Sequence, residues 1–275
     1  MPINTNKVFL KPFSFLLRDL LMMTSYKLNF ILQLAGIFIS TLLFYFLSKL
    51  FERGINDYLQ PYGGNYFAFV LIGIAITDYL TVSLGSFAGE IRNAQMMGTL
   101  EALLVTPTSA PTILFSSSLF SFVLTSVRII IYLIYGILFF GLSLHVTHLP
   151  LLLLIMCLTI LSFTGLGLIS AGFIIIFKQG SPLSWIVTTA SGVLGGILYP
   201  VSVLPAWIQP FSYLLPITHA LEAIRQIVLN GNGFSTVWHE IFILGFFCLT
   251  LLPAGVAFLL YGLRRARTDG SLIHY

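Results

Sequence analysis

The recurrence of long apolar windows constrains this chain more than any other feature. An α-helix of about 20 apolar residues crosses a hydrocarbon core roughly 30 Å thick. Six such windows lie near 28–48, 66–89, 113–144, 149–177, 183–204 and 239–261. The mean hydropathy is +0.99 and only 8% of the residues are charged. The sequence therefore predicts one all-α polytopic membrane domain over residues 1–275, with six transmembrane helices.

The connections between the windows exclude several kinds of function. None approaches the roughly 100 residues that a soluble catalytic domain needs, and the nucleotide-binding loop GxxxxGK[ST] does not occur. We therefore expect no catalytic residue, no cofactor bound by this chain and no nucleic-acid partner. Cys157 and Cys248 fall within windows, and His145 and His148 have no third ligand nearby. We expect neither a disulfide nor a metal site.

Basic residues predict the orientation, because they are enriched on the cytoplasmic side of membrane proteins. With the N-terminus inside, Arg128 falls within a window, and only Lys49, Arg53 and Arg225 lie outside. The nine cytoplasmic residues are then Lys7, Lys11, Arg18, Lys27, Arg92, Lys178, Arg264, Arg265 and Arg267. The reverse orientation would invert the bias, so we expect both termini in the cytoplasm.

The segment before the first window is apolar but too short to cross a bilayer. Residues 12–23 read PFSFLLRDLLMM, in which Pro12 suits a first helical position and Arg18 and Asp19 interrupt the apolar pattern. We predict an interfacial helix in the inner leaflet, and a frayed terminus is the alternative.

Residues 199–233 are apolar but interrupted. The stretch begins at Tyr199 and contains the prolines Pro200, Pro205, Pro210 and Pro216, which forbid one continuous helix. Non-helical backbone at membrane depth survives only where protein buries it or where it lines a wet cavity. We predict a re-entrant helical hairpin from the outer face, with Glu222 and Arg225 on one face of a helix over 219–229 and Gly231 after its end. A partly immersed extracellular loop is the alternative.

Residues 90–107 form a polar stretch between two apolar windows, reading EIRNAQMMGTLEALLVTP. Its helix formers place Leu100, Leu103 and Leu104 on one side and Glu101 on the other, and Pro107 ends the turn. So polar a segment in this chain predicts a docking site for a soluble partner. A solvated loop is the alternative.

Two charged residues fall deep within windows. An unpaired ion at a helix centre costs roughly 2.5–3.5 kcal/mol, so Asp78 and Arg128 should face protein or water rather than lipid. Their windows are consecutive and antiparallel, which makes an intramembrane ion pair possible. A substrate contact is the alternative.

Small residues recur at a spacing of four, which lets helix backbones approach closely in lipid. The pairs are Gly85 with Gly89, Gly167 with Ala171, and Gly192 with Gly196, and Gly195 lies beside the last pair. They predict tight helix packing.

The ordered combination resembles a known family. A short amphipathic N-terminal segment, six windows, the loop GTLEALLVTPTS and the late segment YPVSVLP…PITHALEAIRQIVLNG are similar to the permease subunits of type-2 ATP-binding-cassette (ABC) exporters. The resemblance implies a plasma-membrane homodimer that pairs with two ABC ATPase subunits, which bind ATP and Mg. It also implies export of amphiphilic, lipid-like or drug-like substrates, with lipid-linked polysaccharide as the alternative.

The same resemblance assigns roles to particular residues. Residues 90–107 would hold the coupling helix that sits in a cleft of the ATPase, and the fifth window would line the dimer interface and export path through Gly192, Gly195 and Gly196. The coupling residues are Glu90, Arg92, Gly98, Thr99, Leu100, Glu101, Leu104, Thr106 and Pro107. The residues of the re-entrant gate are Tyr199, Pro200, Pro205, Pro216, Glu222 and Arg225.

Two other classes of function fit the sequence less well. A secondary transporter would need coupling-ion carboxylates at the midplane and broken helices in two matching repeats. Here Asp78 is the only acidic residue deep within a window, and the interrupted segment occurs once. An intramembrane scaffold leaves both the polar loop and the interrupted segment unexplained.

Overall fold

The computed structural model describes residues 27–51, 56–96, 110–145, 147–177 and 182–268, and these form helices and turns. Five helices are long and apolar enough to cross a membrane. They are α2 (Lys27–Phe51), α4 (Tyr66–Met96), α6 (Ala110–Phe140), α7 (Leu149–Phe177) and α11 (Phe234–Thr268). The all-helical, multi-pass architecture expected from the apolar windows is therefore confirmed.

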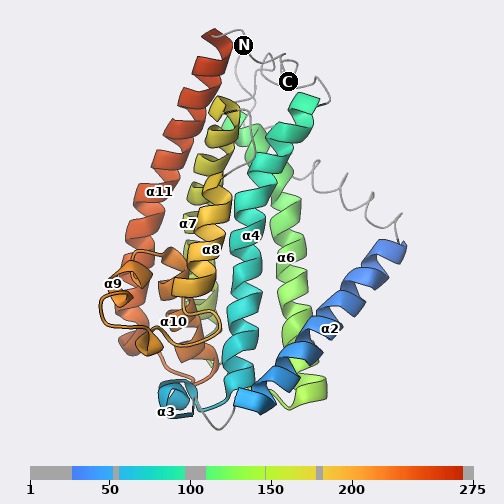
Figure 1. The fold of residues 1–275 in the computed structure, drawn as a ribbon, viewed down its shortest axis with the longest axis vertical. Helices are drawn as coiled ribbons and strands as arrows, with labels where there is room; N and C mark the ends of the chain where they lie inside the picture. Colours follow the sequence, from blue (N-terminus) through green and yellow to red (C-terminus); the bar gives the residue numbers. More distant parts are fainter. Residues whose placement is uncertain (1–26, 52–55, 97–109, 146, 178–181, 269–275) are drawn as a thin grey trace.

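The long helices form a bundle around α4 (Figure 1). Helix α4 packs on both α6 and α7, and α7 packs along α11. Helix α4 is the most buried of the five and α2 the least. In Figure 1, α2 leans away from the bundle at the right. The core therefore lies between α4, α7 and α11, with α6 against its side.

Glycine residues allow the central helices to approach closely. A Cβ on Gly167 of α7 would lie 2.2 Å from the Ser83 carbonyl of α4, and one on Gly255 of α11 would lie 2.5 Å from the Gly165 carbonyl of α7. Such contacts exclude any residue larger than glycine. By contrast, a Cβ on Gly85 or Gly89 meets no atom within 4 Å, so this pair does not pack against another helix of the described chain.

The expected helix bounds agree best for α7 and least for the fifth window. Helix α7 covers residues 149–177 as expected, whereas α8 is Pro182–Leu194 and stops ten residues before the expected end at 204. Gly195 and Gly196 follow, and Gly196 has a φ of 74°, a left-handed value that ends a helix. At 13 residues, α8 is only about 20 Å long, too short to cross a bilayer alone.

Two other ends differ from expectation for local reasons. Helix α4 continues past residue 89 to Met96, because no glycine or proline follows Gly89 until Gly98. Helix α6 stops at Phe140, since Gly141 has a φ of 67°. The helix expected over 12–23 and most of the polar stretch, residues 97–107, lie outside the described residues.

The interrupted segment folds into short helices at one end of the bundle. These are η2 (Val201–Val203), α9 (Gln209–Ser212) and α10 (Pro216–Val228), and α10 packs against α11, α7 and α4. Figure 1 shows them at the lower end, near α3 (Asn56–Leu59) and η1 (Gln60–Tyr62). We refer to this as the α10 end of the bundle. Helices α4 and α11 end at the opposite end.

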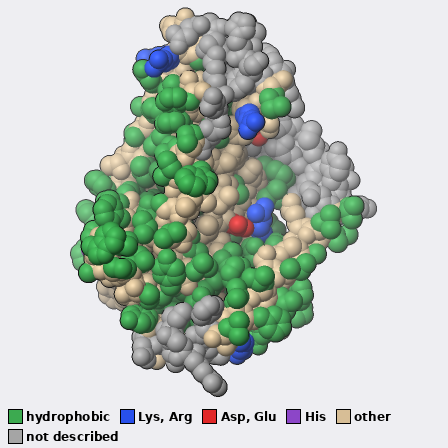
Figure 2. Space-filling model, viewed as in Figure 1, with side chains coloured by type: hydrophobic (Ala, Val, Ile, Leu, Met, Phe, Trp, Pro, Cys, Tyr) green, Lys and Arg blue, Asp and Glu red, His purple; other side chains and the backbone are tan. Residues whose placement is uncertain are grey.

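The outer surface is that of a protein immersed in hydrocarbon. Hydrophobic side chains gather over much of the face in Figure 2, and charged side chains are sparse on it. Large apolar side chains point outward from several helices, among them Leu50 of α2 and Phe242 and Leu249 of α11. Such continuous apolar exposure suits a lipid-facing surface.

Candidate functional site

Helix α10 is the best-buried short element of the chain. Pro216 occupies its first turn, where a missing N–H leaves no bond unmade, and Gly231, with a φ of 70°, follows its end. Most side chains of α10 are buried, and the polar residues Glu222 and Gln226 lie one turn apart on its less buried side. The helix therefore inserts an apolar surface between α4, α7 and α11.

Arg225 is the functional candidate with the most unusual environment. Its side chain is buried, with only 2% of the residue exposed. Nη1 donates to the carbonyl oxygen of Gly196 at 2.7 Å, and Nη2 donates to those of Ile197 at 3.0 Å and Phe69 at 2.9 Å. The guanidinium also stacks on the Phe69 ring, 3.3 Å from its centroid. A planar group with five fixed donors suits this arrangement of acceptors.

These bonds tie together three segments that are far apart in the sequence. Gly196 and Ile197 follow the end of α8, Phe69 lies in the first turns of α4, and Arg225 belongs to α10. The carbonyls of Gly196 and Ile197 lie beyond the end of α8 and accept no hydrogen bond within a helix. The arginine donates the hydrogen bonds that these buried carbonyls need. We call Arg225, Phe69, Gly196 and Ile197 the Arg225 clasp.

Gly73 lets the clasp close. A Cβ at this position of α4 would lie 2.4 Å from the Ile197 carbonyl oxygen and 2.9 Å from Nη2 of Arg225. The first contact is with backbone, which has little room to shift. Only glycine therefore fits where the end of α8 crosses α4.

We expect Gly73→Ala to destabilise the protein by about 1–3 kcal/mol, the usual penalty for overpacking a core. The matched control is Gly85→Ala on the same helix, where a Cβ meets no atom within 4 Å. Thermal stability in detergent measures both variants, and Gly85→Ala should equal or exceed the parent because alanine favours a helix. Equal stability of the two variants would show that the α8 end does not lie against Gly73.

Glu222 takes different partners from those of Arg225. Its carboxylate accepts a hydrogen bond from the Tyr62 hydroxyl at 2.6 Å and one from Nε2 of Gln226 at 3.0 Å. Burial, followed by the negative charge of Glu222, raises the pKa of Tyr62, so the hydroxyl stays protonated and donates. The sequence placed Glu222 and Arg225 on one helix face, but the structure gives Glu222 the role of fixing α10 to η1.

A third link joins α10 to α11. Nδ1 of His219 lies within hydrogen-bonding distance of the Glu240 carboxylate, and Nε2 lies 2.9 Å from the carbonyl oxygen of Tyr213. Because both ring nitrogens face acceptor oxygens, both carry protons when the carboxylate is ionised.

Sequence reasoning missed Tyr62, Gly73, His219 and Glu240. The signal for His219 and Glu240 was present, since each is a polar side chain in an apolar stretch that must find a partner. Tyr62 and Gly73 gave no such signal, because tyrosine and glycine are common in this chain.

Asp78 and Arg128 meet in the middle of the bundle. Oδ2 of Asp78 on α4 lies 3.3 Å from Nη1 of Arg128 on α6, and the two side chains are 25% and 31% exposed. The hydroxyls of Tyr79, the residue after Asp78, and Ser126, two residues before Arg128, are 2.7 Å apart. Polar contacts therefore cross the α4–α6 interface near the midpoint of both helices.

Removing one ion of this pair should leave the other without a partner. We expect Asp78→Asn or Arg128→Gln alone to lower stability by up to about 3 kcal/mol, while the double variant recovers part of that loss. Thermal unfolding of the two single variants, the double variant and the parent gives the coupling. Strictly additive losses would mean that the two charges contribute nothing to each other.

The expected dimer-interface glycines differ in their surroundings. A Cβ on Gly192 of α8 meets nothing within 4 Å, so this position is open. Gly195 lies against the Ser191 carbonyl and Ile217, and Gly196 against Val201, so both face their own chain. Tyr199 donates its hydroxyl proton to the Val193 carbonyl, which holds the bend after α8. Of the three glycines, only Gly192 is placed to meet another molecule.

The remaining expected gate and coupling residues fall into two groups. Pro200 and Pro216 are buried, whereas Pro205 is exposed in the turn before α9. Glu90 and Arg92 lie on the last turns of α4. The other coupling residues, Gly98, Thr99, Leu100, Glu101, Leu104, Thr106 and Pro107, lie outside the described part of the chain.

Five long apolar helices are those of a polytopic membrane protein, and a buried arginine bound to backbone carbonyls lies at one end of them. The family model for ABC-2 type transporters matches residues 17–229. This match covers more than half of the chain, which therefore belongs to the ABC-2 type transporter family. It is a membrane transport permease of an ABC transporter, rather than the subunit that hydrolyses ATP.

Three relatives illustrate the range of similarity. The inner membrane transport permease YadH of Escherichia coli strain K12 is 25% identical over 221 residues, which are 78% of this chain and 84% of that protein. The putative transport permease ycf38 of Cyanophora paradoxa is 29% identical over 214 residues, 72% of this chain and 68% of that protein. The probable multidrug ABC transporter permease YbhR of Escherichia coli strain K12 is 24% identical over 170 residues, 62% of this chain and 44% of that protein.

Proposed function

We propose that this chain is the membrane subunit of an ATP-driven exporter in the inner membrane. Two copies form the translocation path, and each copy binds one separate ABC ATPase subunit that supplies ATP hydrolysis. The cargo is amphiphilic, lipid-like or drug-like. The family match over residues 17–229 carries this proposal, and the names of YadH and YbhR support the location and the class of cargo.

We propose that the α10 end faces outward and that the opposite end is cytoplasmic. Arg92, Arg264 and Arg265 lie on the last turns of α4 and α11, at the end opposite to α10. That placement agrees with the enrichment of basic residues on the cytoplasmic side. The loop over 97–109 then lies in the cytoplasm, where a soluble ATPase can reach it.

We propose that α8 and the segment over 199–233 together make the sixth crossing. Helix α8 covers about 20 Å, and the Arg225 clasp fixes its end to α4 inside the bundle. The short helices that follow would complete the path to the outer face as a re-entrant hairpin. Backbone that is not helical at this depth is tolerated because protein surrounds it.

A reconstitution experiment tests the proposal. The purified chain alone should hydrolyse no ATP, and hydrolysis should appear when an ABC ATPase subunit from the same genome is added. Differently tagged copies of the chain should co-purify, and a Gly192→Cys variant should crosslink between copies. Hydrolysis by the chain alone would contradict the assignment of subunits, and a complex with one permease copy would contradict the dimer.

A further inference from the structure

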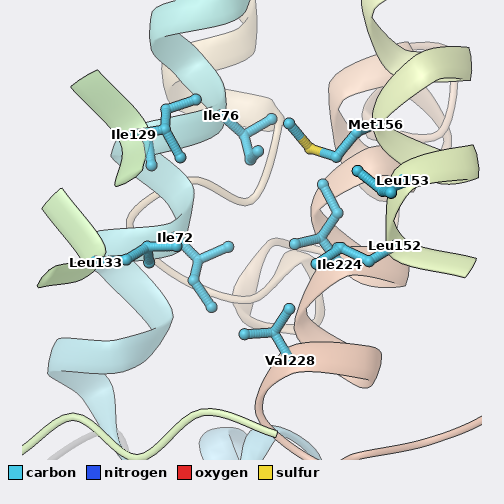
Figure 3. Close-up of a pocket in the computed structure, with 10 residues that line it drawn as sticks. Ile72, Ile76, Ile129, Leu133, Leu152, Leu153, Met156, Ile224 and Val228 are labelled. Atoms are coloured by element: carbon cyan, nitrogen blue, oxygen red, sulfur yellow. The ribbon is translucent and has the colours of Figure 1, made fainter. Parts of the chain in front are cut away.

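An apolar cavity of about 120 Å³ lies between four helices near the α10 end. It is lined by Ile72 and Ala75 of α4, by Leu133 of α6, by Leu153 and Met156 of α7, and by Ile224 of α10. Figure 3 shows these side chains, Ala75 excepted, labelled around one open space. Helices α6 and α7 each pack on α4, so the cavity is a slot between them.

The chemistry of the lining restricts the occupant. The side chains that line the slot are aliphatic apart from the thioether of Met156. A water molecule needs two to four polar partners to occupy a cavity, and these side chains offer none. The occupant must therefore be apolar.

The mouth of the slot opens toward the bilayer. Leu153, one of the lining residues, is 60% exposed, and Leu154 of α7 and Ile130 of α6, each next in sequence to a lining residue, are also exposed. All three belong to helices long and apolar enough to cross the membrane. The medium next to the mouth is therefore hydrocarbon.

We propose that this slot binds the end of an acyl chain from a bilayer lipid. An empty void loses the dispersion contacts that its lining would otherwise make, so an apolar chain beside an open mouth gains by entering. The volume is close to that of an engineered cavity of about 150 Å³ that holds benzene, so a chain end fits and a whole lipid does not. The proposal does not depend on the direction of transport or on the cargo.

An acyl chain bound in the slot would contact α10, the helix that carries Arg225. Ile224 lines the slot, and the next residue, Arg225, holds the end of α8 and α4. An acyl chain in the slot therefore contacts α10 one residue away from the arginine that holds the clasp carbonyls. The lipid would act as a structural part of the permease.

Photolabelling of the full chain tests the proposal. The chain is reconstituted in nanodiscs of phosphatidylcholine that carries a diazirine near the end of one acyl chain, and adducts are mapped by mass spectrometry after irradiation. We expect adducts on the slot residues Met156 and Ile72, in addition to exposed positions such as Ile137. Ala75→Phe fills the slot and should reduce the Met156 adduct at least fivefold, while the Ile137 adduct is unchanged.

Two controls separate occupancy from misfolding and from surface lipid. Ala254→Phe makes the same change at an exposed position of α11 and should leave all adducts unchanged. If Ala75→Phe does not give a monodisperse protein, Ala75→Leu fills less of the slot and should reduce the adduct by a smaller factor. Adducts confined to exposed positions, or a Met156 adduct that survives the filled slot, would overturn the proposal. A disulfide between two copies of Leu153→Cys would do the same, because a second copy would then cover the mouth.

Discussion

Replacing Arg225 with methionine is expected to abolish transport while leaving binding of the ATPase intact. Methionine approximates the length of the arginine stem but donates no hydrogen bond, so the carbonyls of Gly196 and Ile197 lose their buried partner. Each unsatisfied carbonyl costs about 1–3 kcal/mol, which gives a total of about 2–6 kcal/mol. The bend after α8 would then have no fixed position against α4.

Transport assays, ATPase pull-down and thermal stability decide this prediction together. Arg225→Lys should recover only part of the activity, since one ammonium cannot replace a planar guanidinium that bonds to three carbonyls and stacks on Phe69. The matched control is Arg264→Met, an exposed arginine at the opposite end of the bundle, which should keep the parent's thermal stability. Normal transport by Arg225→Met would mean that the clasp has no part in function.

Changes in the loop over 97–109 should have the opposite pattern. Glu101→Arg reverses a charge and Leu104→Asp introduces one in the sequence that resembles a coupling helix. A desolvated charge without a partner at an interface costs about 2–5 kcal/mol, so ATPase binding should weaken at least about 30-fold. Transport should be lost with it, and insertion and dimerisation should be normal, because neither substitution changes a residue of the apolar helices.

Glu222→Ala provides the contrast for the loop variants. It removes the bonds that hold Tyr62 and Gln226 at the α10 end, and should impair transport without changing ATPase pull-down. Full ATPase binding and transport by both loop variants would show that the ATPase docks elsewhere.

The long helices were predictable because lipid imposes one simple rule on each of them. Residues 149–177 contain no charged residue and follow a turn, and α7 has those limits. Helix α8 was not predictable by the same rule. Residues 195–204 are as apolar as a membrane helix, but Gly195 and Gly196 allow the backbone to turn. The hydrogen bonds of the Arg225 clasp then stabilise that turn.

Arg225 shows why the site was harder to infer than the fold. Counted by sequence, it is one of the few basic residues on the outer side. In the structure it is buried and bonded to carbonyls contributed by residues 156, 29 and 28 positions away in the chain. Side-chain chemistry indicates that an arginine needs acceptors, but backbone carbonyls occur at every residue and give no signal of which ones will be used. The pairing of Asp78 with Arg128 was easier to predict. Each is the one charged residue of its window, the two windows are consecutive, and the two charges are opposite.

Helix α4 is a long continuous helix that carries the clasp near one end. It runs unbroken for 31 residues, Tyr66–Met96, which is about 46 Å, and the Phe69 carbonyl held by Arg225 lies in its first turns. A tilt of only a few degrees at Met96 therefore displaces the far end by several ångströms relative to a neighbour that stays still. Since α8 and α10 are fastened to that far end, they would travel with it as one piece, and no chain of small rearrangements through the bundle would be needed to carry the motion across the membrane.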